Sequence, residues 1–188
     1  DKMTSPETML RRAENSGDIR ALHIAKAYVK YQTQLKDNNA LDFDDMILKT
    51  VELFEKASRV LCMGSGGSML MAQECAHLFS TVTDKFTAIG DSHMQMSALA
   101  IMKPTDVIIL FSYSGATTNG LQVLELAKNR GIKTILITRF PKSPAAKLAD
   151  VVLRCGSNEG PFQLGSVAAK IAQLVVVDVL FQEYYSRN

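Results

Sequence analysis

Cysteine is scarce in this chain. The three residues, Cys62, Cys75 and Cys155, are odd in number and widely spaced. That pattern provides neither a disulfide framework nor the ligand pairs of a zinc site, so we expect buried free thiols in a reducing cytoplasm and no metal. Long apolar runs are missing too. No stretch approaches the roughly 20 residues that cross a bilayer, so we expect no contact with a membrane.

An excess of charge of one sign is also lacking. The chain has 21 lysines and arginines against 19 aspartates and glutamates, a formal net charge of +2. A nucleic-acid-binding surface usually concentrates basic residues, so we expect no direct DNA binding by this chain. No GxxxxGK(S/T) loop is present, and Met69 replaces the third glycine that a GxGxxG fingerprint needs after Gly64 and Gly66. We therefore predict no cofactor.

The chain has two parts that differ in their sequence pattern. Residues 1–57 show helical patterns throughout, with a start signal at Thr4–Glu7 and later helices at about 19–35 and 42–56. From Arg59 on, β-rich runs alternate with helical stretches, which is typical of α/β folds. The predicted strands are Arg59–Met63, Phe86–Ile89, Asp106–Ser112, Lys133–Thr138 and Asp150–Arg154, and the predicted helices are Ser68–Val82, Ser92–Met102, Thr117–Arg130 and Gly165–Tyr185.

The strands at residues 106–112 and 133–138 are almost continuously apolar. Strands that are covered on both faces have this composition, as parallel sheets require. We therefore predict an α/β fold, a three-layer doubly wound sandwich with a five-stranded parallel sheet (flavodoxin-like), preceded by an α-helical N-terminal extension. The predicted domains are a helical segment at residues 1–57 and the α/β domain at residues 58–188.

Polar residues follow two of the predicted strands, where ligands of doubly wound sheets bind. The third strand leads into Ser112, Ser114 and Thr117 at the start of a helix. Hydroxyls and helix-start amides can together surround the oxygens of a phosphate, whereas helix capping by Thr117 accounts for only one hydroxyl. The first strand leads into a glycine-rich loop with Ser65 and Ser68, which is either a simple tight turn or a binding loop.

Glu159 and His93 are the candidates for catalysis. Glu159 follows the fifth strand, where it hydrogen-bonds a sugar, acts as the base of an isomerase, or is a solvated loop acid. His93 follows the second strand and faces either the pocket or solvent. His77, on a helical stretch, is a weaker candidate. Nothing in the sequence fixes an acid–base pair, so enzymatic activity is left uncertain, and binding without catalysis is favoured.

Residues from Arg59 to about Tyr185 resemble the sugar isomerase (SIS) domain. The resemblance rests on VLCMGSGGS, DSHMQMSA, DVIILFSYSGATTNGLQVLELAKNRG and TRFPKSPAAKLADVVL. Within that superfamily they look most like the effector domain of RpiR-type transcriptional regulators, which sense a phosphosugar. The resemblance implies that Ser65 and Ser68 lie in the first ligand loop, that the phosphate-binding residues are Ser112, Ser114 and Thr117, and that Glu159 lies at the pocket edge.

The same resemblance implies the partners. The expected ligand is a phosphorylated sugar or amino sugar, and the resemblance implies that a neighbouring subunit completes the pocket. DNA is expected to bind only through a helix-turn-helix domain, which this chain lacks. The helix predicted at residues 165–185 is apolar on most sides between Ile171 and Phe181, more than one sheet face needs, so we expect a homodimer or homotetramer.

The first 57 residues resemble a different family. The stretch AYVKYQTQLKDNNALDFDDMILKTVELFE is similar to a helical region of UvrD-type superfamily 1 helicases. The missing Walker A motif gives no support to helicase activity. The likeness indicates a fusion or chimera, or else Leu41–Lys56 is simply the helix that precedes the first SIS strand. Three functions follow: a phosphosugar-sensing effector module, a phosphosugar aldose–ketose isomerase, or an engineered or chimeric protein without native activity.

Overall fold

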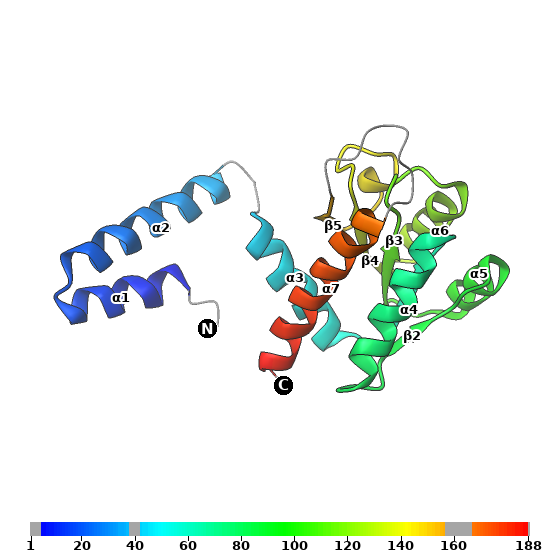
Figure 1. Ribbon diagram of the computed structural model, residues 1–188, viewed down its shortest axis with the longest axis horizontal. Helices are drawn as coiled ribbons and strands as arrows, with labels where there is room; N and C mark the ends of the chain where they lie inside the picture. The colour runs from blue at the N-terminus through cyan, green and yellow to red at the C-terminus, as the bar shows by residue number, and fades with distance from the viewer. Residues whose placement is uncertain (1–4, 38–41, 157–166, 188) are drawn as a thin grey trace. The chain divides into compact units, whose positions relative to one another are not determined.

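The computed structural model describes residues 5–37, 42–156 and 167–187, in two compact units, residues 1–45 and 46–188 (Figure 1). The larger unit holds one sheet of five parallel strands in the order β2-β1-β3-β4-β5. The strands are β1 (Val60–Gly64), β2 (Phe86–Ala88), β3 (Val107–Phe111), β4 (Lys133–Thr138) and β5 (Val151–Arg154). The predicted α/β fold with a five-stranded parallel sheet is thereby confirmed.

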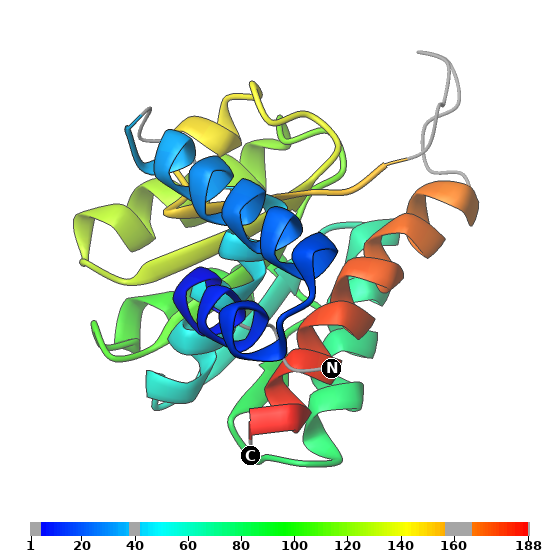
Figure 2. The same cartoon turned by 90° about the vertical axis from the view of Figure 1, so that its left-hand side faces the viewer.

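Helices cover both faces of this sheet. One face carries α3 (Phe43–Lys56), α4 (Gly67–Ser80) and α7 (Val167–Arg187), and the other carries α5 (Ser92–Ile101), α6 (Thr118–Asn129) and the short 3-10 turn η1 (Ala145–Lys147). Figures 1 and 2 both draw α7 alongside α4. The result is the three-layer sandwich that alternating strands and helices form through right-handed crossovers.

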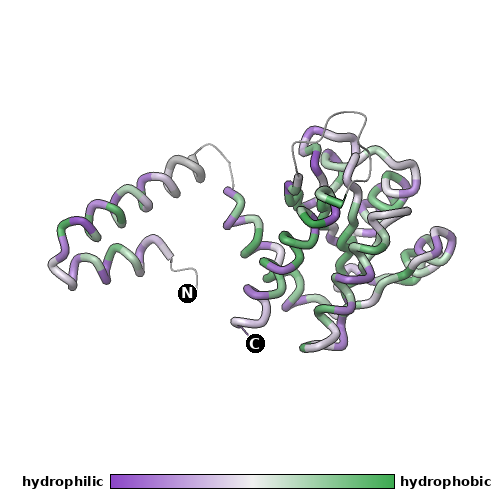
Figure 3. The backbone as a smooth tube through the Cα atoms, viewed as in Figure 1, coloured by the Kyte–Doolittle hydropathy of each residue, from purple (hydrophilic) through white to green (hydrophobic). Residues whose placement is uncertain are grey.

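The two faces explain why the central strands are apolar throughout. In β3, Val107, Ile109 and Phe111 enter the core under α4 and α7, while Ile108 and Leu110 enter the core under α5 and α6. Every residue of β3 is buried. Figure 3 shows hydrophobic residues concentrated in the strands and the helices that cover them. None of the helices in the described ranges combines the length and hydropathy needed to cross a membrane.

The smaller unit is a pair of helices, α1 (Pro6–Ser16) and α2 (Ile19–Asp37). The Ser5 hydroxyl accepts a hydrogen bond from the Thr8 amide at 3.2 Å, and Gly17 ends α1 with φ of 69°. These are the capping residues that helix ends favour.

Helix α3 packs against the sheet, as the interpretation of residues 41–56 as the helix before the first SIS strand expects, although the predicted domain boundary assigns it to the N-terminal segment. Its residues Ile47, Val51 and Phe54 are fully buried in the same core as α4 and α7. The compact unit therefore begins at Met46, ahead of the predicted boundary between residues 57 and 58. That boundary remains a prediction about where the family domain starts.

Candidate functional site

The loops that follow β1 and β3 leave the sheet side by side. These strands are neighbours, and Gly64 pairs with Phe111 at the end of their shared ladder. Adjacent parallel strands that end at the same level bring their following loops together. Both loops then enter helices, α4 and α6, whose first amides have no partner within the helix.

The loop after β3 is a tight turn lined by hydroxyls. The Gly115 amide donates to Ser112 O at 3.1 Å, and the Ala116 amide donates to Ser114 Oγ at 3.3 Å. Gly115 has φ of 62°, a left-handed conformation that glycine adopts without strain. The loop thus turns back on itself and holds its serines at the end of the sheet.

Thr117 stands at the N-cap position of α6, but its side chain makes no capping hydrogen bond. Instead, its Oγ1 lies 3.4 Å from Oγ of Ser112, which is only 4% exposed. Helix capping therefore does not account for this hydroxyl in the structure. Two hydroxyls and the uncapped start of α6 share one small region, which is an arrangement suited to an anion.

The glycine-rich loop after β1 faces α6. Ser65 is exposed, and its Oγ accepts a hydrogen bond from Asn119 Nδ2 at 3.3 Å. Ser68 lies in the first turn of α4 and is partly buried. Gly66 has φ of 55° and provides no side-chain cap, and the Ser68 and Met69 amides donate to the backbone carbonyls of Ser65 and Gly66. This loop is thus tied to the first turn of α6 through Asn119.

The Gln95 side chain connects these loops through hydrogen bonds, and the sequence did not predict this role. It is fully buried on α5, and its Nε2 donates to Gly64 O at 3.0 Å and to Ile89 O at 2.7 Å. Its Oε1 accepts from Asn119 Nδ2 at 3.0 Å. One amide therefore connects the ends of β1 and β2 with the first turn of α6. The only signal in the sequence is a glutamine at a buried position of an apolar helix.

The ammonium group of Lys170, on α7, lies close to the loop that follows β1. A Cβ atom placed on Gly67 would lie 3.3 Å from Lys170 Cε and 3.9 Å from Lys170 Nζ, so this ammonium group lies beside the start of α4. No acidic side chain in the described ranges forms an ion pair with it. A lysine next to the positive end of a helix dipole favours an anion between them.

The structure thus brings together five of the predicted site residues at the carboxyl ends of β1 and β3. They are Ser65, Ser68, Ser112, Ser114 and Thr117. His93 is exposed in the first turn of α5, and His77 is exposed on α4, 3.8 Å from Glu74. Glu159 lies outside the described residues. Within the described part of the chain, no group of three or more His, Cys, Asp or Glu side chains is placed to hold a metal ion.

Two family profiles match the sequence. The SIS domain profile matches residues 53–182, and the UvrD/REP helicase N-terminal domain profile matches residues 1–91. The helicase match extends into the sheet domain, because β1, α4 and β2 all lie before residue 91. Over that stretch the structure is that of the α/β sandwich, so the helicase likeness has weak support beyond the N-terminal helices.

Curated relatives include an uncharacterized HTH-type transcriptional regulator of Caldanaerobacter subterraneus, 36% identical over 135 residues, which covers 72% of this chain and 48% of that protein. The HTH-type transcriptional regulator RpiR of Escherichia coli is 31% identical over 137 residues, covering 73% of this chain and 46% of RpiR. The chain therefore spans about half the length of these relatives.

Solved structures agree on the fold. The sugar isomerase domain of an RpiR transcription factor from Sphaerobacter thermophilus has a TM-score of 0.69 at 26% identity, covering 76% of this chain and 78% of that one. The NanR protein of Vibrio vulnificus, solved with ManNAc-6P, has a TM-score of 0.73 at 24% identity, covering 98% of this chain and 75% of NanR. Since the SIS profile spans well over half of the sequence and the fold agrees, this chain belongs to the SIS domain family.

Proposed function

We propose that this chain binds a phosphorylated sugar or amino sugar and serves as the ligand-sensing effector module of an RpiR-type regulator. One observation carries the proposal: the Ser112 and Thr117 hydroxyls lie 3.4 Å apart at the uncapped start of α6. A phosphate dianion has several acceptor oxygens, and it requires donors at close range. Hydroxyls and free helix-start amides supply them at this position.

The proposed phosphate site is the loop from Ser112 to Thr117, with Ser65 and Ser68 approaching from the loop after β1. Lys170 supplies a positive charge beside Gly67. In the proposed complex, Ser112, Ser114 and Thr117 donate to phosphate oxygens, while Ser65, Ser68 and Glu159 contact the sugar. The RpiR likeness and the ManNAc-6P bound to NanR support this class of ligand.

Several wider statements belong to the same proposal. DNA binding would reside in another domain of the whole protein, as in HTH-type relatives, and the protein would act in the cytoplasm. The fusion or chimera hypothesis for residues 1–57 draws its support from the helicase profile match. The isomerase alternative rests on His93 and Glu159, and His93 is exposed at the start of α5.

Ser114→Ala tests the phosphate site. Ser114 is only partly buried and its hydroxyl bonds within its own loop, so we expect the variant to fold. A hydrogen bond to a charged group contributes about 1.5–3 kcal/mol, so affinity for the sugar phosphate should fall roughly 10- to 100-fold. Thermal melts with a panel of sugar phosphates measure this, since a ligand at a hundredfold excess over its Kd stabilises wild type by about 2.7 kcal/mol.

Ser97→Ala provides the matched control, because Ser97 is exposed on α5 away from both loops. It should retain the full ligand-induced shift. If no sugar phosphate raises the melting temperature of wild type, or if Ser114→Ala responds as strongly as wild type, the proposed site is wrong.

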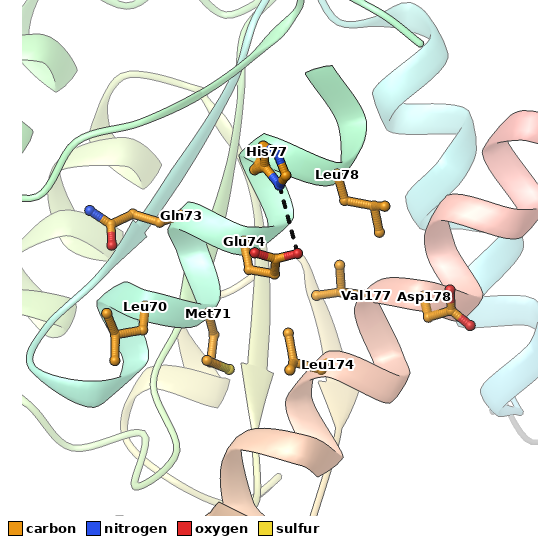
Figure 4. Close-up of a pocket in the computed structure, with 9 residues that line it drawn as sticks. All are labelled: Leu70, Met71, Gln73, Glu74, His77, Leu78, Leu174, Val177 and Asp178. Atoms are coloured by element: carbon orange, nitrogen blue, oxygen red, sulfur yellow. Dashed lines mark ion pairs between the residues drawn. The ribbon is translucent and has the colours of Figure 1, made fainter. Parts of the chain in front are cut away.

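We also propose that the chain self-associates through α4 and α7. A groove of about 700 Å³ runs between these helices (Figure 4), and apolar side chains from both line it alongside the polar Gln73, Glu74, His77 and Asp178. Figure 4 shows Met71 on α4 and Leu174 and Val177 on α7 beside the space between the two helices, together with the polar Glu74. Leu70 and Val175 are 53% and 57% exposed. Exposed apolar side chains concentrated on one face are typical of an interface, and a second copy matches them through two-fold symmetry.

A buried charge is expected to abolish that interface. Leu70→Glu places a carboxylate in the proposed contact, where burial of an unpaired charge is costly, so the molar mass measured by light scattering after size exclusion should fall to that of a monomer. The control is Ile101→Glu on α5, which changes an apolar side chain that is 71% exposed on another surface. A dimer that survives Leu70→Glu, or an equal effect of both variants, would refute this interface.

A further inference from the structure

The side-chain amide of Gln95 can lie only one way round. Its Nε2 donates to two backbone carbonyls, Gly64 O at 3.0 Å and Ile89 O at 2.7 Å. A carbonyl oxygen has no proton to donate, so a reversed amide would place Gln95 Oε1 against two other acceptors. Gln95 is fully buried, where such a mismatch is costly. Its Oε1 therefore faces Asn119 as an acceptor.

The orientation of Gln95 fixes that of Asn119 in turn. Asn119 is the second residue of α6 and is partly buried. Its Nδ2 donates to Gln95 Oε1 at 3.0 Å and to Ser65 Oγ at 3.3 Å, which engages both of its protons. The remaining atom of this amide, Oδ1, is an acceptor to which no residue in the described ranges donates. Its position follows from the two backbone carbonyls that hold Gln95.

The same hydrogen bonds set the role of Ser65. Its Oγ accepts from Asn119, so the hydroxyl proton points elsewhere, and Ser65 is exposed. A donor, the Ser65 hydroxyl, thus lies beside an acceptor, Asn119 Oδ1. This Oδ1 belongs to the same amide as Nδ2, 3.3 Å from Ser65 Oγ, so one ligand hydroxyl about 2.8 Å from each can bond both. A phosphate oxygen or a ring oxygen only accepts and cannot bond Asn119 Oδ1.

Both atoms lie next to the proposed phosphate site. Asn119 follows Thr117 by two residues, so their Cα atoms lie within about 7.6 Å of each other. Ser65 follows β1, which pairs with β3 on the side away from β4. A ligand whose phosphate contacts Ser112 and Thr117 therefore extends its sugar toward β1. The ligand group that reaches Asn119 belongs to the carbons nearest to the phosphate.

We propose that Asn119 is a specificity-determining residue: its Oδ1 accepts a hydrogen bond from the ligand hydroxyl next to the phosphate-bearing carbon, and Ser65 donates to the same hydroxyl. This inference rests on the proposed function, in which the loop from Ser112 to Thr117 holds the phosphate. When a sugar ring closes at that carbon, its oxygen becomes an ether without a proton. The ligand class is therefore a sugar phosphate whose hydroxyl next to the phosphate ester is not closed into a ring.

Two ligands that differ in one substituent test the assignment. Sorbitol 6-phosphate carries a hydroxyl on carbon 5, and 5-deoxy-5-fluorosorbitol 6-phosphate carries a fluorine there, which has no proton to donate. Calorimetric titration of the whole chain should show that wild type prefers sorbitol 6-phosphate by about five- to tenfold, the effect of one hydrogen bond. Asn119→Ala should remove that preference, because it leaves no acceptor at this position.

Two further variants separate the acceptor atom from the stability of the fold. Asn119→Asp keeps an acceptor oxygen, so the preference should persist, while its negative charge weakens binding of both ligands. An acidic residue in the first turn favours a helix, so this variant should fold. Asn129→Ala makes the same change as Asn119→Ala at the exposed last residue of α6 and should leave both Kd values unchanged.

Titration with inorganic phosphate distinguishes this inference from the function on which it rests. If neither inorganic phosphate nor sorbitol 6-phosphate binds to wild type, the phosphate site fails and this inference fails with it. If inorganic phosphate binds but wild type does not discriminate between the two hexitol phosphates, the assignment of Asn119 is overturned while the phosphate site stands. A preference that survives Asn119→Ala, or that Asn129→Ala removes to the same extent, would also overturn it.

Discussion

Gln95→Leu is expected to lower the free energy of unfolding by about 3 kcal/mol, because it removes three hydrogen bonds made by a fully buried amide. The Gly64 and Ile89 carbonyls lose this donor, and Asn119 loses its acceptor. For a domain of this size, the melting temperature should fall by roughly 6–12 °C. Sugar phosphate binding should weaken as well, since the same amide positions the ends of β1 and β2 and the start of α6.

Urea unfolding of two further variants gives reference values for this loss of stability. Gln122→Leu makes the same chemical change at an exposed position of α6 and should alter stability by less than about 0.5 kcal/mol. Asn119→Ala removes only the bonds that Asn119 donates to Ser65 and Gln95 and should cost about 1 kcal/mol. A Gln95→Leu variant as stable as Gln122→Leu would show that the buried amide does not join these loops.

Gly115→Ala should damage the phosphate loop more than any serine substitution. An alanine Cβ would lie 2.1 Å from Ser143 Oγ and 2.6 Å from Ser143 Cβ, at a residue whose φ is 62°. Ser143 is buried, and its hydroxyl accepts a hydrogen bond from the Ala146 amide, so it has little freedom to retreat. We expect a loss of about 3 kcal/mol or more from the overlap and the left-handed backbone together, with binding of sugar phosphates abolished.

Gly131→Ala isolates the backbone contribution. Gly131 has φ of 69° but open space around it, so its substitution carries only the conformational cost, about 1–2 kcal/mol. Ligand affinity should remain near that of wild type. The double variant Gly115→Ala/Ser143→Gly removes the side chain in the way and should recover part of the lost stability. Equal losses in Gly115→Ala and Gly131→Ala would contradict the predicted overlap.

The central sheet was predictable because burial of a strand on both faces is visible in the composition of that strand alone. A strand buried on both faces is apolar at nearly every position, and the segments 106–112 and 133–138 are almost continuously apolar. The hydroxyl-rich loop was predictable for a related reason, since topology alone places the carboxyl ends of parallel strands at one edge. Helix α3 shows the limit of such patterns: its apolar stripe at Ile47, Val51 and Phe54 predicts a covered face, but not which element covers it.

By itself, the sequence determined the α/β class, the SIS resemblance and the five hydroxyl residues of the candidate site. Only the tertiary structure decided that Gln95 bonds to Gly64, and that Lys170 and Arg139 lie against Gly67 and Gly156. Except for Arg139 and Gly156, these partners stand far apart along the chain. A contact of this kind depends on the order of the strands and the packing of the helices. The residue type of either partner therefore does not predict it.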